Sequence, residues 1–467
     1  MVLKTRSEKD SLGVREIPAD VYYGVQTDRA VENFPVSGLR AHPRFIDAFI
    51  TIKKAAAIAN LKSGVLSGDL ANALIKACDE ILAGNLRDQF PVDVFQMGAG
   101  TAFNMNVNEV ISNRGNEILG GEKGSYKPIN PNDHANMSQS TNDCFPTAVR
   151  IGTLLLLREY LYAPLEALEK TFFAKGKEFD AVLKSGRTHL QDAVPIRLGQ
   201  EFAAYGLALK KCRLSLVAAE KSLFELGIGG SAVGTGLNTP KGYREAVMDA
   251  LKKETGLPLV AAEDMREAMQ SQRPVAEVSS SLRNLALEIT RIVNDLRLLS
   301  SGPTTGLAEI QLPATAPGSS IMPGKVNPSI LEMVNMVAFQ VIGCDATIAY
   351  AVQAGQLELN VMMPLMAFNM NFMITIFGNA LKIFKEKCAD GITADKERCL
   401  NYAEASMGLA TALNATIGYA AAAEICKEAL KSGKSIIGLI REKKLLSDSE
   451  IKKVMDPVKM TEPGLPG

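Results

Sequence analysis

The 467-residue sequence has no tryptophan, only three histidines and no excess of either charge. Its 51 Lys and Arg residues balance 51 Asp and Glu residues, so net charge gives no reason to expect a nucleic-acid or anionic-membrane partner. The seven cysteines are widely spaced and never form a Cys-x-x-Cys pair, which argues against a disulfide framework or a thiolate metal site. We therefore expect a reducing, cytoplasmic location.

The sequence also lacks a clear secretory signal or membrane span. Its first ten residues carry acidic side chains and no apolar core, unlike a signal peptide. Residues 359–381 carry no charge, but they contain four asparagines and a proline, which suit a protein interior better than lipid. We expect a helix that is buried on all sides within a bundle, and no membrane partner.

Long apolar repeats are the main feature of the sequence. In residues 275–299 the apolar side chains recur at alternating spacings of three and four, which is a heptad seam. Pro274 precedes this segment and Gly302-Pro303 follows it, as is typical of a helix start and stop. Similar long patterns cover residues 153–183, 200–226 and 329–350. These patterns predict a mostly α fold with a long central helical bundle.

Changes of pattern along the chain predict three domains. Residues 1–142 form a mixed, mainly helical domain, with helical patterns at 46–63 and 67–83. Residues 143–391 form the central long-helix bundle, and residues 392–467 form a small C-terminal helical domain.

Polar, glycine-rich segments interrupt the helical patterns. They are residues 98–106, 136–143, 186–192 and 317–328. Each segment alone is equally typical of a cap or a turn, because Ser, Thr, Asn and Gly favour such places. Together, hydroxyls, amides and helix N-termini make good anion sites, so we expect each segment at a helix start and around a small anionic ligand. Lys325 is the obvious cation for that ligand.

Motifs for nucleotide or metal binding are incomplete. Residues 227–232 match the dinucleotide pattern GxGxxA, but they follow a helical pattern rather than a strand. Residues 318–325 have the wrong glycine spacing for a P-loop. His42, His134 and His189 have no partner at ligand spacing, so we expect no metal site. His189 lies among polar residues and is better interpreted as a site histidine that can relay a proton.

Residues 318–328 resemble the signature loop of the aspartase/fumarase superfamily, and the other three polar segments match that family's remaining site segments in order and spacing. The resemblance covers essentially the whole chain. It implies a mostly helical, three-domain subunit and a homotetramer built around a shared bundle, with active sites that combine segments from three subunits. It also implies a dicarboxylate substrate and no organic cofactor, while activation by a divalent cation stays open.

Within the superfamily, three segments are more similar to aspartases than to class II fumarases: residues 22–27, 98–101 and 138–143. This similarity implies reversible deamination of L-aspartate to fumarate and ammonia. The alternatives are hydration of fumarate to L-malate, or a related amino-succinate lyase. Thr304 stands where aspartases have Arg, Met363 stands where they have Glu, and residues 229–234 are nearer the fumarase version, so the exact substrate stays open.

The resemblance also implies roles for individual residues. Ser319 would act as an alkoxide general base that removes the C3 proton and leaves an aci-carboxylate intermediate, and His189 would be the second catalytic residue. The implied substrate-binding residues are Thr101, Ser140, Thr141, Asn142, Thr188, Ser320, Lys325 and Asn327. Which residue protonates the departing nitrogen is left open.

Overall fold

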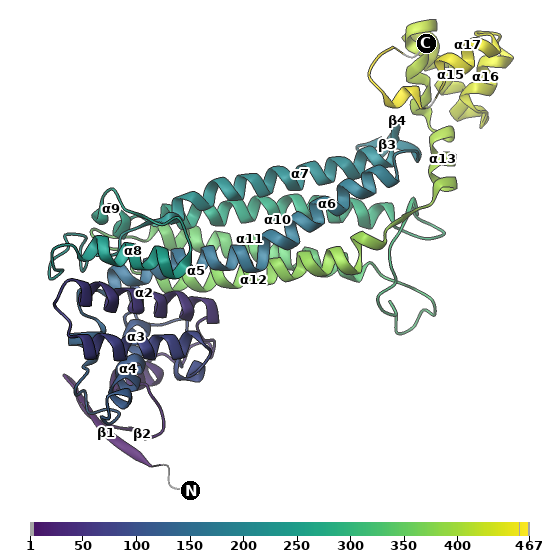
Figure 1. Ribbon diagram of the computed structural model, residues 1–467. Coiled ribbons are helices and arrows are strands. Elements are labelled where there is room, and N and C mark those ends of the chain that lie inside the picture. The colour runs from purple at the N-terminus through teal and green to yellow at the C-terminus, as the bar shows by residue number, and fades with distance from the viewer. Residues whose placement is uncertain (1–3, 457, 466–467) are drawn as a thin grey trace. The chain divides into compact units, whose positions relative to one another are not determined.

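The computed structural model describes residues 4–456 and 458–465, and most of them are helical (Figure 1). The chain divides into two compact units. Unit 1 contains the described residues up to Ala163, with residues 214–286 and 339–378, and unit 2 contains residues 164–213, 287–338 and the described residues from Asn379 onward. The three domain boundaries expected from the sequence stay a prediction, because these units are assembled from segments that alternate along the chain.

The elements that lie wholly in unit 1 are β1 (Thr5–Asp10), β2 (Gly13–Pro18), α1 (Val25–Asn33), α2 (Pro43–Lys62), α3 (Gly68–Leu82), α4 (Thr101–Ile118), α5 (Thr141–Leu156), β5 (Glu225–Leu226), α8 (Tyr243–Thr255), β6 (Val260–Ala261) and α9 (Met265–Gln270). Those of unit 2 are β3 (Leu183–Thr188), β4 (Gln191–Arg197), β7 (Ile310–Gln311), β8 (Thr393–Ala394), α13 (Lys396–Ala405), α14 (Asn414–Ile417), α15 (Tyr419–Ser432), α16 (Ile436–Glu442) and α17 (Asp448–Val454). The unit boundaries fall inside or at the start of α6 (Tyr162–Glu178), α7 (Leu198–Ala219), α10 (Arg273–Leu299), α11 (Ser329–Gln353) and α12 (Met363–Lys387).

The sheets are small. β1 pairs with β2, β3 with β4, and β7 with β8, all antiparallel, and β5 and β6 form a short parallel pair. The β3–β4 hairpin places Leu183 opposite Arg197 and Thr188 opposite Gln191, with a bulge between Ser185 and Arg187. The core therefore lies between helices rather than between sheets.

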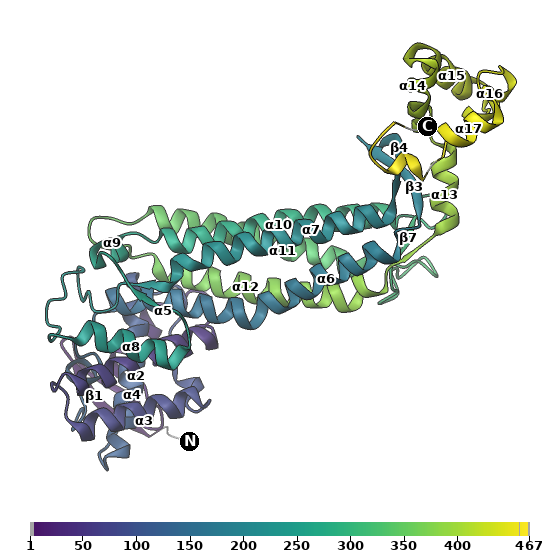
Figure 2. The same cartoon turned by 45° about the horizontal axis from the view of Figure 1, so that its top comes forward.

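Helix α10 confirms the heptad prediction. It begins at Arg273, carries Pro274 in its first turn and ends at Leu299. All eight apolar positions of the predicted seam are buried, and Leu299, at 7%, is the most exposed of them. Figures 1 and 2 show α10 side by side with α7 and α11. Burying an aliphatic stripe of this length is the main apolar gain available to the bundle.

Helices α11 and α12 differ in how much of their apolar surface is covered. α12 begins at Met363, later than the uncharged stretch that starts at residue 359, and buries most of its side chains, although Phe372 is 39% exposed. Among the described residues, α11 alone is long and apolar enough to cross a membrane by length and composition, and 39% of its most apolar window is buried. The core helix of a soluble protein passes the same test, so this finding is weak evidence for a membrane span.

The pattern over residues 153–183 predicts one helix, and the structure breaks it. A π-helical turn at Leu157–Leu161 separates α5 from α6, and α6 ends at Glu178. Residues 179–182 are a non-helical connection, and strand β3 begins only at Leu183, so the helix ends five residues before the predicted pattern does. Similarly, α7 ends at Ala219, earlier than the predicted 226.

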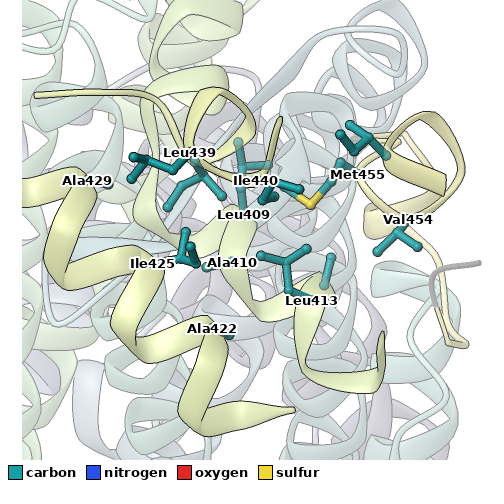
Figure 3. Close-up of a cluster of buried hydrophobic side chains, with 13 residues drawn as sticks. Leu409, Ala410, Leu413, Ala422, Ile425, Ala429, Leu439, Ile440, Val454 and Met455 are labelled. Carbon is teal, nitrogen blue, oxygen red and sulfur yellow. The ribbon is translucent and has the colours of Figure 1, made fainter. Parts of the chain in front are cut away.

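The C-terminal residues of unit 2 have an apolar core of their own (Figure 3). Its members come from α15, α16, α17 and the 3₁₀ segment Met407–Leu413. Leu413, Leu439 and Ile440 are fully buried within it. Because these contacts are local to residues 409–455, we expect this segment to open more readily than the rest of the chain.

We predict that Leu439→Ala loosens this C-terminal core. Truncating a fully buried leucine costs about 2–5 kcal/mol, so amide hydrogen exchange across residues 409–455 should speed up by about 30-fold or more. Leu430 on α15 is 72% exposed, and Leu430→Ala is the matched control, expected to leave exchange nearly unchanged. Equal effects of the two variants on exchange would contradict the local core.

Candidate active site

The predicted site residues fall into two groups, one in each unit. Thr101, Ser140, Thr141 and Asn142 belong to unit 1, at the starts of α4 and α5. The unit 2 group lies on the β3–β4 hairpin and on the loop before α11: Thr188, His189, Ser319, Ser320, Lys325 and Asn327.

Thr101 is the first residue of α4, and a strained turn leads into it. Ala99 and Gly100 both have positive φ, 61° and 82°. A Cβ on Gly100 would lie 2.0 Å from the Phe145 ring, so this close approach requires glycine. The Ala99 N–H donates to the Val361 carbonyl at 2.7 Å, which holds the turn. The result is a half-buried hydroxyl at a helix N-terminus, where an anion is stabilised.

Ser140, Thr141 and Asn142 open helix α5 through a capping box. The Ser140 hydroxyl accepts the Asn142 N–H at 3.2 Å, and the Asp143 carboxylate accepts the Ser140 N–H at 2.9 Å. Satisfying these otherwise free N–H groups fixes the first turn of the helix. The predicted contact residues therefore stand on a defined helix start.

Asp143 also binds a second segment. Its Oδ2 accepts the N–H groups of Gly229 at 3.1 Å and Ser231 at 2.9 Å. Complete burial raises its pKa to about 6, although its three backbone N–H donors and buried Lys53 pull that pKa back down. The dinucleotide-like pattern at residues 227–232 thus directs its N–H groups at a carboxylate of the same chain.

The residues around this pattern partly differ from the sequence expectation. Residues 227–232 follow the two-residue strand β5, not a helix. The next helix, α8, begins only at Tyr243, so the strand–turn–helix arrangement of a dinucleotide site is still missing.

A buried polar network lies under the 136–143 segment. The ammonium of fully buried Lys53 donates to the Asn136 side-chain oxygen at 3.0 Å, and Asn108 donates to the same oxygen at 3.1 Å. Burial lowers the pKa of Lys53. Asn60 continues the network by accepting the Ser138 hydroxyl at 2.7 Å. These contacts fix the loop that leads into Ser140.

A cavity of about 420 Å³ lies next to Thr101, and Gln26 and Glu109 also line it.

Glu109 of α4 is 1% exposed, and its side chain accepts the backbone N–H groups at the start of α1. Its carboxylate accepts the N–H groups of Gly24, Gln26 and Thr27 at 2.9, 2.9 and 3.1 Å. Burial raises its pKa to about 7, and the negative charge of Glu8 acts in the same direction. This carboxylate holds residues 24–27 against the middle of α4.

In unit 2, Thr188 and His189 lie at the tip of the β3–β4 hairpin, and both are exposed. His189 and Leu190 have φ of 54° and 59°, as a two-residue hairpin turn requires. The expectation of a helix start for residues 186–192 is therefore wrong. The left-handed pair turns the chain back on itself into a strand.

A buried ion network holds the base of this hairpin. Glu309 is 0% exposed and pairs with Arg187 through both carboxylate oxygens, at 3.0 and 2.9 Å. Lys184 lies 3.4 Å from Glu309 and donates to Glu201 at 2.9 Å. Because Glu309 directly precedes β7, the network connects the hairpin to the segment that leads into the Ser319 loop.

The Ser319 loop closes on itself. The Gly318 N–H donates to the Lys325 carbonyl at 2.8 Å, and Asn327 Nδ2 donates to the Gly318 carbonyl at 2.6 Å. The Ser319 Oγ accepts two backbone N–H groups, from Ile321 at 3.2 Å and from Met322 at 2.9 Å. This arrangement aims two dipoles at the oxygen that the sequence predicts as the base.

Ser319 and Lys325 line one wide, open cavity of about 620 Å³. Ser320 and Lys325 are exposed, and Ser319 and Asn327 are half-buried. A positive ammonium that lines the same cavity attracts an anionic ligand.

The other histidines have structural partners. His42 caps α2 by accepting the Arg44 N–H, and His134 accepts the Asn130 N–H. Across residues 4–456 and 458–465, no group of three or more His, Cys, Asp or Glu side chains is arranged to hold a metal ion. Of the two departures from the aspartase pattern, Met363 is fully buried and Thr304 is exposed.

Glu109, Asp143 and Glu309 are the functional candidates that sequence analysis missed. One signal was available for Glu109. Helix α4 carries polar residues at positions that periodicity would assign to the core, and most of them are buried. Asp143 stands inside the polar segment 136–143, but its partners 86 and 88 residues away are not visible in sequence.

Comparisons with known proteins agree with this architecture. Residues 13–343 match the family described as Lyase, and residues 409–462 match the one described as Fumarase C C-terminus. The aspartate ammonia-lyase of Bacillus subtilis (strain 168) is 50% identical over 462 residues, covering 99% of this chain and 97% of its own length. That of Pseudomonas aeruginosa is 48% identical over 468 residues, covering 99% and 98%.

Solved structures show the same fold. The fumarate lyase:delta crystallin of Brucella melitensis, bound to cobalt, superposes with a TM-score of 0.95 at 47% identity, covering 98% of this chain and 100% of its own. The recombinant class II fumarase of Schistosoma mansoni superposes with a TM-score of 0.96 at 36% identity and the same coverage. The mostly α expectation is thereby confirmed.

We predict that Glu109 makes stability depend on pH. Its pKa in the folded protein, about 7, lies above the ordinary 4.5, so its stabilising contribution is complete below pH 4.5 and is lost as pH rises through 7. When the pH falls from about 8 to about 5, the unfolding free energy of wild type should therefore rise relative to that of Glu109→Gln by on the order of 3 kcal/mol. Melting temperatures of both proteins across that range measure the gain.

Exposed Glu245 on α8 supplies the control for this pH series. The gap in melting temperature between wild type and Glu245→Gln should stay constant over the same pH range. A gap for Glu109→Gln that is equally constant would contradict the assigned protonation of Glu109.

Proposed function

The chain is a carbon–nitrogen lyase of the aspartase/fumarase superfamily, and we propose that its substrate is L-aspartate, which it converts reversibly to fumarate and ammonia. The support for this substrate is that relatives named aspartate ammonia-lyase align with nearly the whole chain at about half identity. Dicarboxylate recognition also suits the polar helix starts in unit 1 and the Lys325 loop in unit 2.

The observation that carries the proposed chemistry is the environment of Ser319. A serine hydroxyl is a weak base in water, so it must act as the alkoxide. Two N–H groups, from Ile321 and Met322, already donate to Ser319 Oγ, and they would stabilise its negative charge. Lys325 lines the same cavity and adds a positive charge.

We propose that the reaction proceeds in two steps. The Ser319 alkoxide removes the proton from C3 of aspartate, and the C–H electron pair moves into the neighbouring carboxylate to give an aci-carboxylate with one more negative charge. That pair then returns to form the C2–C3 double bond as the C2–N bond breaks, and the bonding pair of the C2–N bond leaves with the protonated amino group, which becomes neutral ammonia. No net oxidation occurs, so we propose that no organic cofactor is required.

Donors placed where charge develops would lower the barrier most. Ser140 and Thr141 stand at the start of α5, and Thr101 stands at the start of α4. We assign them, with Ser320 of the Ser319 loop, to the β-carboxylate and its aci-carboxylate form. Helix N-termini and hydroxyls stabilise such charge without a buried cation.

The remaining residues would bind the other end of aspartate. We assign Lys325 and Asn327 to the α-carboxylate. Asn327 Nδ2 uses one N–H on Gly318, which leaves its second N–H for the substrate. Asn142, Thr188 and His189 would contact the amino group or the nearer carboxylate. Because Asn142 Nδ2 donates to the Ala232 carbonyl, its Oδ1 is the end free to accept an N–H of the substrate amine.

We propose that the site is completed by other copies of the chain. Helix α11 has one buried stripe and a second stripe that faces solvent in the single chain. The exposed stripe includes Met336 (68% exposed), Phe339 (57%) and Tyr350 (70%) at near-heptad spacing. An apolar stripe of this kind is typical of an interface. A homotetramer would cover it and could join the two groups of site residues from three subunits.

We also propose a cytoplasmic location, since all seven cysteines carry free thiols, as a reducing compartment requires. Hydration of fumarate is the second candidate. It is favoured by the resemblance of residues 229–234 to the fumarase version and by the shared fold with a class II fumarase.

We predict that purified protein produces fumarate from L-aspartate and not from L-malate. Ultraviolet absorbance of fumarate measures both reactions in parallel cells. Fumarate from malate alone would replace the proposal by the hydratase alternative. No fumarate in either cell, from well-folded protein, would contradict both assignments.

We predict that Ser319→Ala lowers kcat for L-aspartate by about a thousandfold or more, because it removes the base itself. Circular dichroism and sedimentation should be unchanged, since the Ser319 side chain is half-buried in an open loop. Ser432→Ala, on an exposed serine at the end of α15, controls for serine loss and should keep full activity. Near-native turnover by Ser319→Ala would disprove the base assignment.

A further inference from the structure

The glycine-rich loop at residues 227–232 has a form that the reaction does not explain. Its sequence matches the pattern GxGxxA, and the backbone N–H groups of Gly229 and Ser231 converge on an anion. That anion is the Asp143 carboxylate. The loop is therefore filled by the chain itself, at the helix that carries three predicted substrate contacts.

The loop needs unusual backbone geometry to reach Asp143. Gly229 and Ser231 have φ of 89° and 57°. At Gly234, φ is 85°, and a Cβ there would lie 2.5 Å from the Arg266 Cα atom. The first two of these left-handed residues turn their own N–H groups towards Asp143, while the Gly230 N–H between them donates to the Gly227 carbonyl. Strain of this kind persists where the surroundings hold it, and the Asp143 carboxylate supplies that hold.

The contact runs in both directions between the loop and the start of α5. Loop N–H groups bind Asp143, while the Ala232 carbonyl accepts Asn142 Nδ2 at 2.9 Å. On its other oxygen, Asp143 holds the Ser140 N–H. Thus Asn142 contacts the loop directly, and Ser140 is connected to the loop through Asp143. These two residues lie on either side of Thr141.

An ordinary capping box does not include hydrogen bonds from a distant segment, as the Asp143 contact does. Helix α17 has one, in which Glu450 accepts the N–H and hydroxyl of Ser447, its own N-cap. Asp143 makes the same local bond and adds two donors from a distant segment. It is also completely buried, whereas Glu450 is exposed. Burying a carboxylate beside an anion-binding site is costly, and stabilising the helix end alone does not require it.

We propose that Asp143 is a positioning residue: by binding the 229–231 loop to the start of α5, it fixes Ser140, Thr141 and Asn142 for the developing aci-carboxylate and the amine. The inference rests on the proposed function. Asp143 itself is buried and acts only through these neighbours. Fully buried Lys53, on the network beneath the segment, supplies the compensating positive charge.

Asp143→Asn tests the role because it keeps the shape and puts an N–H₂ group where one of the N–H acceptors was. With full-length protein and L-aspartate, kcat should fall by about tenfold or more, and KM should rise less. The change in kcat is expected to exceed the change in KM because the aci-carboxylate carries more charge than the substrate. Misplaced donors therefore destabilise the transition state more than the bound substrate. Unchanged kcat in folded Asp143→Asn would overturn the proposal.

Gly229→Ala approaches the same contact from the loop. Its φ of 89° strains any side chain, and a new Cβ would lie 3.3 Å from the Arg244 Cβ atom. It should reproduce the kcat loss, and the double variant should lose little more than either single one, because both break one contact. Fully additive losses would overturn the proposal. If Asp143→Asn fails to fold, Gly229→Ala decides alone, and wild-type kcat in that variant counts against it.

Glu450→Gln is the matched control, because it disrupts the capping box of α17 and should lower thermal stability while leaving kcat and KM unchanged. An equal kcat loss from Glu450→Gln would show that helix capping in general, and not this contact, sets the rate. Hydrogen exchange separates the inference from the proposed function. If wild type makes no fumarate from L-aspartate, the function fails, yet Asp143→Asn should still speed exchange at Gly229 and Ser231. Unchanged exchange there would overturn the contact itself.

Discussion

Burial of one aliphatic stripe on each long helix is the constraint from which the rest of this structure follows. The seam of α10 is almost completely inaccessible to water along its length. A helix that must bury such a stripe cannot carry polar chemistry along it, so polar groups collect where helices start and where loops connect them. The predicted site residues at Thr101, Ser140 and the Ser319 loop all occupy such places.

Buried carboxylates organise those places. Glu109 receives the backbone N–H groups that begin α1, Asp143 receives those of the 229–231 loop, and Glu309 receives Arg187 at the hairpin base. Each one satisfies donors that would otherwise be unpaired in the interior. The protein's own negative charges are thus used to hold loops. Under the proposed function, neutral hydroxyls, helix N-termini and Lys325 would bind the charged groups of the substrate.

Sequence analysis predicted what depends on local pattern. The α10 seam, its proline start and the polar segments before α4, α5 and α11 follow from periodicity and from helix-start residues. It failed where pairing between distant residues decides. The β3–β4 hairpin stands where a helix start was predicted at residues 186–192, because cross-strand hydrogen bonds and a left-handed pair at His189 and Leu190 outweigh local propensity. The loop partners of Asp143, more than 80 residues away, left no local trace.

The N–H groups that donate to the Ser319 hydroxyl belong to the same loop as the hydroxyl itself. The two N–H groups that face the hydroxyl belong to the second and third residues after it, and the loop is closed by bonds between Gly318 and its far end. Whatever displaces the loop therefore displaces the oxygen and its stabilising dipoles together. The basicity that we propose for Ser319 would therefore be a local property of the loop, which moves with it. The proposed substrate-binding residues, by contrast, belong to elements far apart in the chain, so under this proposal loop movement would control access to the substrate and not the strength of the base.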